Sequence, residues 1–294
     1  MSQPPAHTTP TFIPLPVGPG SRSEDDSLEY MHMPRGMNTY RAPVLPEPEL
    51  LQDLTIARVT LRTLQGALAA AQRGERPAPI ELTNVPAADR RLLDSVLGEG
   101  EVSAVLEGPT RLHVQEAIFA GVWRVIETAA DGCMSDRLEV GPLPAAILER
   151  ATRDGQLCGA TAPAAPTLEG LMNAPAILSE LQHYWRADTR ADSFAPAYIV
   201  NLTLLPLSAA DELWLDAVLG RGSVTLLSRG YGNCRIASTA RPHTWRVVYY
   251  NSQDHVILST IEVSIVPEVA CAAMQDLADS EARVAEVLAW IEGA

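Results

Sequence analysis

The chain has 294 residues, 47% of them apolar, and a formal net charge of −14 at pH 7. This length and apolar content suffice for two packed domains, whereas the negative charge argues against nucleic acid, because binding phosphates needs basic patches. No lysine is present, which excludes enzymes that depend on a Schiff-base lysine or on the lysine of a phosphate-binding loop.

Residues 1–45 are rich in Pro, Ser, Thr and Gly and lack apolar periodicity. Such a segment buries too little surface to offset its ordering entropy, so we expect a flexible arm that is a candidate contact segment. The first residues lack a basic start followed by an apolar stretch, and no apolar run approaches the roughly 20 residues that a membrane helix needs. The sequence therefore predicts a soluble cytoplasmic protein without membrane insertion.

The first predicted domain covers residues 46–154. Helical spacing begins after two Pro-Glu pairs and ends near Gly74, a favourable residue after a helix. A short strand and a second helix follow, at 79–82 and 86–97. Alternation of polar and apolar residues then predicts antiparallel strands at 101–106, 112–117, 122–127 and 138–140. A short helix at 145–152 is expected to close the domain.

Residues 155–166, rich in Gly, Ala, Thr and Pro, are the predicted linker, and residues 167–294 are the second domain. The order of elements repeats, with helices at 168–185 and 209–219 on either side of a strand at 198–204. Four strands are expected next, at 223–227, 234–238, 244–250 and 255–263. Two helices, at 267–279 and 281–290, are expected to follow them. Antiparallel strands flanked by helices place each domain in the α+β class.

The two predicted domains have similar sequences. Residues 81–126 match residues 203–248 at a constant offset of 122, and with one inserted residue the match continues from 138–144 to 261–267. A period of this length is the size of a small domain, which indicates duplication and fusion with pseudo-twofold symmetry. Whether the halves join as one sheet or pack through helices stays open.

A Gly-x-Gly sequence follows the equivalent helix in each half, at Gly98 and Gly100 and at Gly220 and Gly222. A phosphate-binding loop runs in the opposite order, from a strand through glycines to the N-terminus of a helix. We therefore expect structural turns in which glycine adopts a positive φ.

A Trp-Arg pair also recurs, as Trp123-Arg124 and Trp245-Arg246. On a strand the two side chains point to opposite faces, which predicts core tryptophans with solvated or acid-paired arginines. A role in recognition is the alternative, since both residue types are common in binding hot spots.

Nothing in the sequence predicts a metal site, a cofactor or a catalytic residue. Asp94 and Asp216 lie on equivalent helices and would form a proton-sharing dyad only if the symmetry brought them together. The four cysteines are widely spaced, without the pairing typical of zinc or cluster ligands: Cys133, Cys158, Cys234 and Cys271.

The segment 227–235 differs most from its counterpart 105–113, because it is richer in glycine, arginine and aromatic character. Divergence between halves favours a contact site around Tyr231, and the alternative is a tight turn. The candidate partner-binding residues are Arg229, Tyr231, Asn233, Arg235, Trp245, Arg246, Glu99 and Arg221. The candidate turn glycines are Gly98, Gly100, Gly220, Gly222, Gly230 and Gly232.

Three blocks of sequence, at 41–49, 97–102 and 220–236, resemble the HupH/HyaF family of hydrogenase expression and formation proteins, which includes HoxQ. Their order and spacing extend the resemblance over nearly the whole chain. It implies a non-enzymatic accessory chaperone for an uptake nickel–iron hydrogenase. Its partner would be the iron–sulfur small-subunit precursor before twin-arginine export, with another accessory protein as a further partner. The resemblance transfers no catalytic residues.

Two alternatives remain open at this stage. One is an iron–sulfur cluster or metal delivery factor that uses the cysteines. The other is an enzyme with a site between the two halves.

Overall fold

The computed structural model describes residues 54–158, 169–186, 197–230 and 232–293. The predicted N-terminal arm, Tyr231 and most of the predicted linker lie outside these residues. Among the described residues, no helix has the length and hydropathy needed to cross a membrane.

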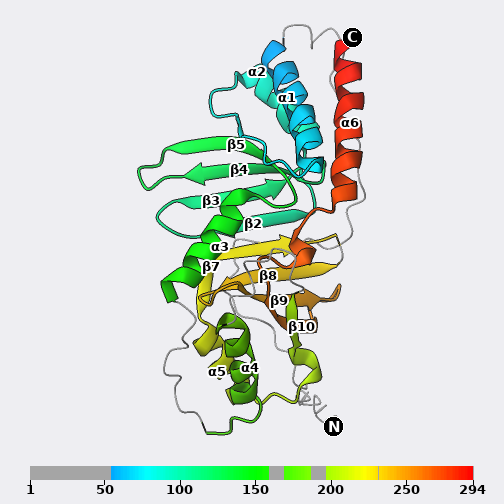
Figure 1. Cartoon of the computed structure of the whole chain (residues 1–294). Coiled ribbons are helices and arrows are strands. Elements are labelled where there is room, and N and C mark those ends of the chain that lie inside the picture. Colours follow the sequence, from blue (N-terminus) through cyan, green and yellow to red (C-terminus); the bar gives the residue numbers. More distant parts are fainter. Residues whose placement is uncertain (1–53, 159–168, 187–196, 231, 294) are drawn as a thin grey trace, which may run out of the picture.

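A ten-stranded antiparallel sheet runs through the molecule in the order β1-β5-β4-β3-β2-β7-β8-β9-β10-β6 (Figure 1). The first half of the chain supplies Ile80–Glu81 (β1), Val102–Leu106 (β2), Arg111–Glu116 (β3), Val122–Thr128 (β4) and Met134–Val140 (β5). The second half supplies Tyr198–Asn201 (β6), Arg221–Ser228 (β7), Asn233–Thr239 (β8), Thr244–Tyr250 (β9) and Val256–Val263 (β10).

The two halves join edge to edge through β2 and β7. Their register places Ala104 opposite Leu226, the residue 122 positions later. At an offset of 122, Val102 corresponds to Val224 and Leu106 corresponds to Ser228. In the sheet these partners are exchanged, because Val102 lies opposite Ser228 and Leu106 lies opposite Val224. The pairing is therefore symmetric about one residue pair, as in an isologous dimer interface.

Backbone hydrogen bonds extend the same symmetry beyond the paired residues. The N–H of Glu107 donates to the carbonyl of Ser223 at 2.8 Å, and the N–H of Arg229 donates to that of Glu101 at 3.1 Å. These bonds are equivalent at an offset of 122, and one closes each end of the junction.

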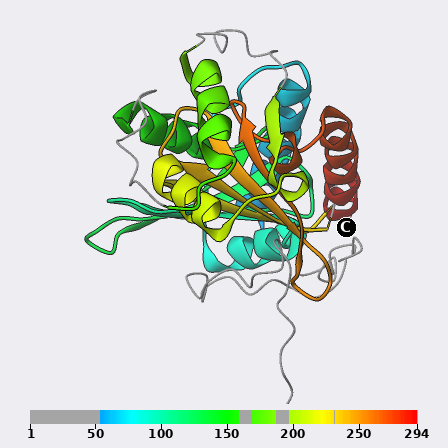
Figure 2. The same ribbon diagram turned by 90° about the horizontal axis from the view of Figure 1, so that it is seen from below.

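Two groups of helices cover the two ends of one sheet face. Thr55–Gln72 (α1), Ala87–Leu97 (α2) and Met274–Glu292 (α6) pack over the end that carries Leu138 of β5. Ala174–Arg186 (α4) and Ala209–Leu219 (α5) pack over the end that carries Ile261 of β10. Figure 1 shows these two groups at the two ends of the sheet, and Figure 2 shows the β4–β5 hairpin projecting to one side.

The opposite face carries a third core, which both halves share. Trp123 and Trp245 are buried there, together with Ile147 of α3 (Ala145–Cys158) and Ala270 of a short 3-10 helix, η4 (Glu268–Ala270). The helix α3 follows the first half in sequence but packs on β7 and β8 of the second (Figure 1). Conversely, α6 ends the second half and packs on α1 of the first.

The predicted α+β class is confirmed. Helix 209–219 and strand 244–250 have the predicted bounds, whereas α3 continues to Cys158, four residues into the expected linker. The strand expected at 198–204 ends at Asn201 and passes into a 3-10 helix, η3 (Leu202–Leu204).

The prediction of two helices at 267–279 and 281–290 was wrong, because the structure has η4 at Glu268–Ala270 followed by the single helix α6 at Met274–Glu292. Ser280, at the predicted break, is 1% exposed inside α6. The constant offset of 122 also fails at β1 and β6, where the sheet register pairs Ile80 with Leu138 and Val200 with Ile261. Two extra residues between β6 and α5 account for this difference.

Candidate functional site: an arginine-lined pocket

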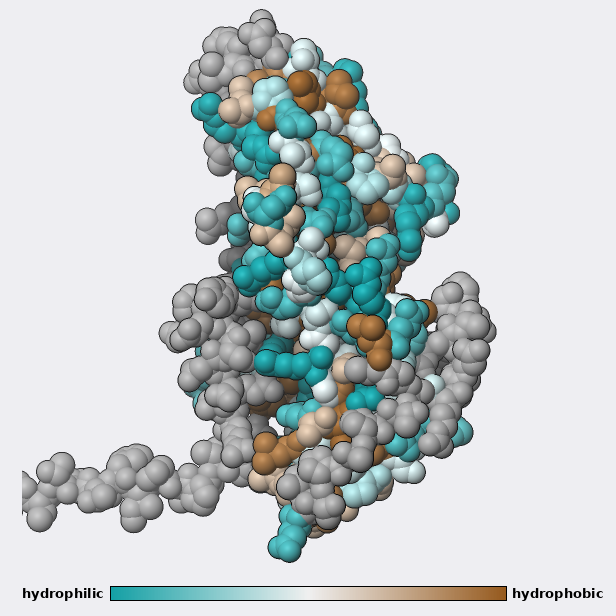
Figure 3. Space-filling model, turned by 90° about the vertical axis from the view of Figure 1, so that its left-hand side faces the viewer, coloured by the Kyte–Doolittle hydropathy of each residue, from teal (hydrophilic) through white to brown (hydrophobic). Residues whose placement is uncertain are grey.

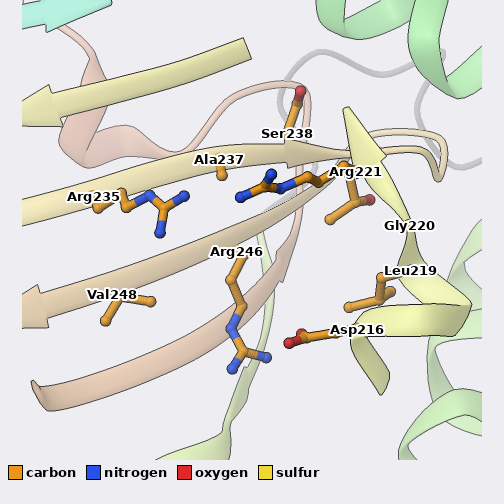
Figure 4. A pocket seen from close by; sticks show the side chains of 10 residues that line it. Asp216, Leu219, Gly220, Arg221, Arg235, Ala237, Ser238, Arg246 and Val248 are labelled. Atoms are coloured by element: carbon orange, nitrogen blue, oxygen red, sulfur yellow. The ribbon is translucent and has the colours of Figure 1, made fainter. Parts of the chain in front are cut away.

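A pocket of about 300 Å³ lies between α5 and the sheet in the second half. Its charged lining consists of Arg221, Arg235 and Arg246 with a single carboxylate, Asp216. Figure 4 shows the guanidinium groups of Arg221 and Arg235 directed toward each other and that of Arg246 directed toward Asp216. The pocket therefore carries an excess of positive charge in a chain whose net charge is −14.

The strands place the arginines by their alternation. Arg246 of β9 lies opposite Ala237 of β8, and Arg235 lies two residues before Ala237 on the same face. The small side chain of Ala237 leaves space above the sheet, whereas Gln115 occupies its position in the first half. Arg221 enters the pocket because Gly220 ends α5 with a φ of +64° and turns the chain into β7.

The first half shows what an equivalent arginine contacts when its site is closed. Arg124 of β4 donates to Asp94 of α2 at 2.7 Å and to the two carboxylate oxygens of Asp136 at 2.7 to 3.2 Å. Arg90 also donates to Asp136, at 2.5 Å. Burial opposes the ionised form of Asp136, but its hydrogen bonds with Arg124 and Arg90 outweigh burial and lower the pKa of this carboxyl.

The second half keeps the strand arginine and the helix aspartate, but neither the central carboxylate nor Arg90, whose counterpart at an offset of 122 is Glu212. Arg246 replaces Arg124 and Asp216 replaces Asp94, both at an offset of 122. Asp136 lies opposite Ile126 on β4, and Ser259 lies opposite Val248 on β9, so Ser259 stands where the first half has Asp136.

A threonine confirms this equivalence independently of the sequence offset. The N–H of Asp136 donates to the hydroxyl of Thr83 at 3.0 Å, and the N–H of Ser259 donates to that of Thr203 at 2.8 Å. Both strands are thus held in the same way, and only the side chain differs.

The loss of the carboxylate leaves buried polar atoms without partners. Within the described part of the chain, Nε and Nη1 of Arg246 and the hydroxyl of Ser259 are buried and make no hydrogen bond. Native proteins rarely leave such donors unsatisfied, because each costs about 1–3 kcal/mol. An unexplained pair of guanidinium donors beside a pocket indicates a site for a hydrogen-bond acceptor.

The other two arginines of the pocket also replace residues of different charge. Arg221 stands in place of Glu99, and Arg235 stands in place of His113. These two exchanges add positive charge to the second half, whereas Glu212 in the place of Arg90 removes it. An arginine cluster of this kind can bind a planar anion through paired hydrogen bonds.

The candidate residues from the sequence divide into two groups. Arg221, Arg235 and Arg246 meet in the pocket, whereas Trp245 lies on the opposite face and is 1% exposed. Its indole N–H donates to the carbonyl of Ser264 at 3.2 Å, which suits a core residue. Arg229 forms a hydrogen bond with the first half across the β2–β7 junction.

The side chain of Arg229 donates to the carbonyl of Gly100 at 3.1 Å. Asn233 begins β8, where it pairs with Tyr250. Glu99 lies between α2 and β2, in the turn equivalent to that of Arg221.

The paired Gly-x-Gly sequences form the predicted structural turns. Gly98 and Gly220 end α2 and α5 with φ values of +52° and +64°. At Gly100 a Cβ atom would lie 2.2 Å from the carbonyl oxygen of Ala117, and at Gly222 it would meet equivalent atoms of β8. Gly232 also has a positive φ, +97°, and at Gly230 a Cβ atom would meet the carboxylate of Glu101.

The remaining chemical candidates lie apart from the pocket. Asp94 and Asp216 are carried by α2 and α5 at opposite ends of the sheet (Figure 1), so the structure does not bring this pair together. Burial raises the pKa of the Cys234 thiol to about 12 and that of Cys271 to about 11. Cys133 is exposed. Among the described residues, no cluster of three or more potential metal-ligating side chains occurs.

Asp136 and Ser259 are the informative residues that the sequence interpretation missed. The aligned repeat resumed at Leu138 and Ile261, two residues too late to compare them. Extending that alignment toward the N-terminus by two residues would have revealed the exchange of a carboxylate for a hydroxyl.

The fold and pocket define an α+β protein with two similar five-stranded halves and an arginine-lined pocket in the second half. Comparison with known sequences identifies its family. The chain belongs to the family described as HupH hydrogenase expression protein, C-terminal conserved region, which matches residues 54–155 and 171–291.

Three relatives match almost their full lengths. The hydrogenase expression/formation protein HoxQ of Cupriavidus necator is 48% identical, over 95% of this chain and 98% of the relative. HupH of Rhodobacter capsulatus, with the same description, is 45% identical over 94% and 96% of the two chains. The hydrogenase-1 operon protein HyaF of Escherichia coli K12 is 33% identical over 96% and 97%.

Proposed function

We propose that this protein is a non-enzymatic accessory chaperone of hydrogenase maturation that holds the iron–sulfur small-subunit precursor in the cytoplasm before twin-arginine export. The observation that carries the proposal is the full-length similarity to relatives described as hydrogenase expression/formation proteins. The halves would derive from one duplicated module, of which the second has specialised for contact with the partner.

The charges of the protein suit an encounter with such a precursor. The net charge of −14 attracts a basic signal segment at long range, and complementary charge raises association rates more than it raises affinity. Figure 3 shows that hydrophilic residues dominate one side of the molecule, with apolar residues in small separate groups. A non-obligate interface is about as apolar as the rest of a protein surface, so a surface of this kind is compatible with such a contact.

The contact surface that we assign to the precursor is the arginine pocket, formed by Arg221, Arg235 and Arg246, together with Arg229, which follows β7, and Asn233, which begins β8. Arginines of this kind are frequent among hot-spot residues. The lining supplies guanidinium groups, one carboxylate, the hydroxyl groups of Ser238 and Thr239, and small or apolar side chains, a set that suits recognition of a polar or acidic group.

Capture of the precursor tests this proposal. Tagged small-subunit precursor, expressed with this protein under mild anaerobic conditions, should retain it on the affinity resin, whereas the mature small subunit without its signal segment should retain less. Mass spectrometry identifies the retained chains. Failure of both the precursor and the mature subunit to retain this protein would exclude a holding role for the small subunit.

A further inference from the structure

We propose that the arginine pocket is a carboxylate site that receives an acidic side chain of the partner protein. This inference deepens the proposed function, on which the protein nature of the partner rests. The chemistry of the pocket itself rests on the comparison between the two halves.

The first half supplies the template for the ligand. There the carboxylate of Asp136 approaches Arg124 through Nε at 3.1 Å and Nη2 at 2.7 Å, an arrangement in which both oxygens accept from one guanidinium group. In the second half the same guanidinium face belongs to Arg246, and the residue in the place of Asp136 is Ser259. The second half therefore lacks a carboxylate at the position where Asp136 binds the strand arginine in the first half.

The pocket also offers the space and the charge that such a ligand needs. Its volume of about 300 Å³ exceeds that of a single carboxylate side chain, and three arginines line it against one aspartate. The buried Nε and Nη1 of Arg246 have no acceptor among the described residues. A carboxylate placed as Asp136 is in the first half would accept from Nε of Arg246, and its negative charge would lie among the three arginines.

A protein partner can reach this site along the middle of the sheet. Ser103, Thr225 and Gln115 lie on the same face between the two helical groups and are partly exposed. No described helix covers this stretch. An acidic side chain presented on an extended segment or a loop can thus enter the pocket while its backbone lies along β2 and β7.

The decisive variant fills the pocket from within. Ser259→Asp restores the carboxylate at the position of Asp136, and Ser259→Asn is the matched control of nearly the same size without charge. We expect Ser259→Asp to melt about 2 °C or more above Ser259→Asn, because the new carboxylate pairs with Arg246. A carboxylate without such a partner would instead lower the melting temperature.

Binding is measured on the wild-type protein with two short capped peptides, Gly-Glu-Glu-Gly and Gly-Gln-Gln-Gly, and with inorganic phosphate as a third probe. The readout is the NMR signal of the Arg246 side-chain N–H. We expect the glutamate peptide to shift this signal, the glutamine peptide to leave it unchanged, and Ser259→Asp to abolish the response. In precursor capture, Ser259→Asp should retain at least tenfold less partner than Ser259→Asn.

Each outcome bears on one part of the inference. The carboxylate site is overturned if Ser259→Asp melts at or below Ser259→Asn, if the glutamate peptide leaves Arg246 unchanged, or if phosphate is preferred over it. If the peptide and melting results hold while the wild-type protein captures no precursor, the carboxylate site stands and the proposed partner is wrong.

Discussion

Arg124 and Arg246 are the same residue type at equivalent positions, and they differ in what surrounds the guanidinium group. Arg124 contacts Asp136 and Asp94, whereas Ser259 stands in the place of Asp136 beside Arg246. The same strand position thus serves stability in one half and is available for binding in the other.

Replacing Asp136 tests the structural side of this contrast. Asp136→Ser leaves Arg90 and Arg124 without their shared acceptor, and we expect it to lower the free energy of unfolding by about 3 kcal/mol, as for other broken buried ion pairs. Ser259→Ala is the matched control and should change it by less than about 0.5 kcal/mol. Equal effects in urea unfolding would contradict the assigned roles.

Glu116 predicts a pH dependence of stability. Burial raises the pKa of Glu116 to about 7, although the N–H of Gly121 donates to it at 3.1 Å and opposes the shift. The folded state therefore binds this proton more tightly than the unfolded state, in which the pKa of glutamate is about 4.3. The resulting stability is present below pH 4 and is lost as the pH rises toward 7.

The variant Glu116→Gln removes this proton binding. Relative to the wild-type protein, its free energy of unfolding should increase by about 3 kcal/mol between pH 4.5 and pH 8. Urea unfolding at both pH values provides the measurement. A difference between the two proteins that does not vary with pH would mean that Glu116 titrates normally.

At the scale of elements, the turn from α2 into β2 depends on close backbone contact. In Gly100→Ala the new Cβ atom would lie 2.2 Å from the carbonyl oxygen of Ala117, so β2 or β3 must move. We expect a loss of about 2–3 kcal/mol in the free energy of unfolding. Gly66→Ala, in the exposed interior of α1 with no atom near the added methyl group, should gain about 0.5–1 kcal/mol.

Elements of this kind are also where prediction from the sequence succeeds. The helix that ends at Gly98 or Gly220 and the strand that follows it can be predicted from local periodicity and glycine chemistry, and their predicted bounds agree with the structure to within two residues. The pocket depends on β8, β9 and α5 meeting in space, and on which strands lie beside β10. Local patterns carry no information about that pairing, so Arg246 could be proposed as a contact residue but its missing partner could not.

At the scale of the whole molecule, the two halves are not separable bodies. They share the core around Trp123 and Trp245, and α3 and α6 each pack on the half to which they do not belong in sequence. We therefore expect a single calorimetric unfolding transition, with equal calorimetric and van't Hoff enthalpies. Two resolved transitions would show that the halves unfold independently and would contradict the shared core.

Capture of the hydrogenase small-subunit precursor by the full-length protein tests the central claim most directly. The wild-type protein should co-purify with the tagged precursor. Arg246→Gln should co-purify at least tenfold less while melting within about 2 °C of wild type, since the lost group makes no hydrogen bond through its buried Nε and Nη1 within the described chain. Undiminished capture by Arg246→Gln would contradict the assigned surface. The absence of capture by the wild-type protein would contradict the proposed function itself.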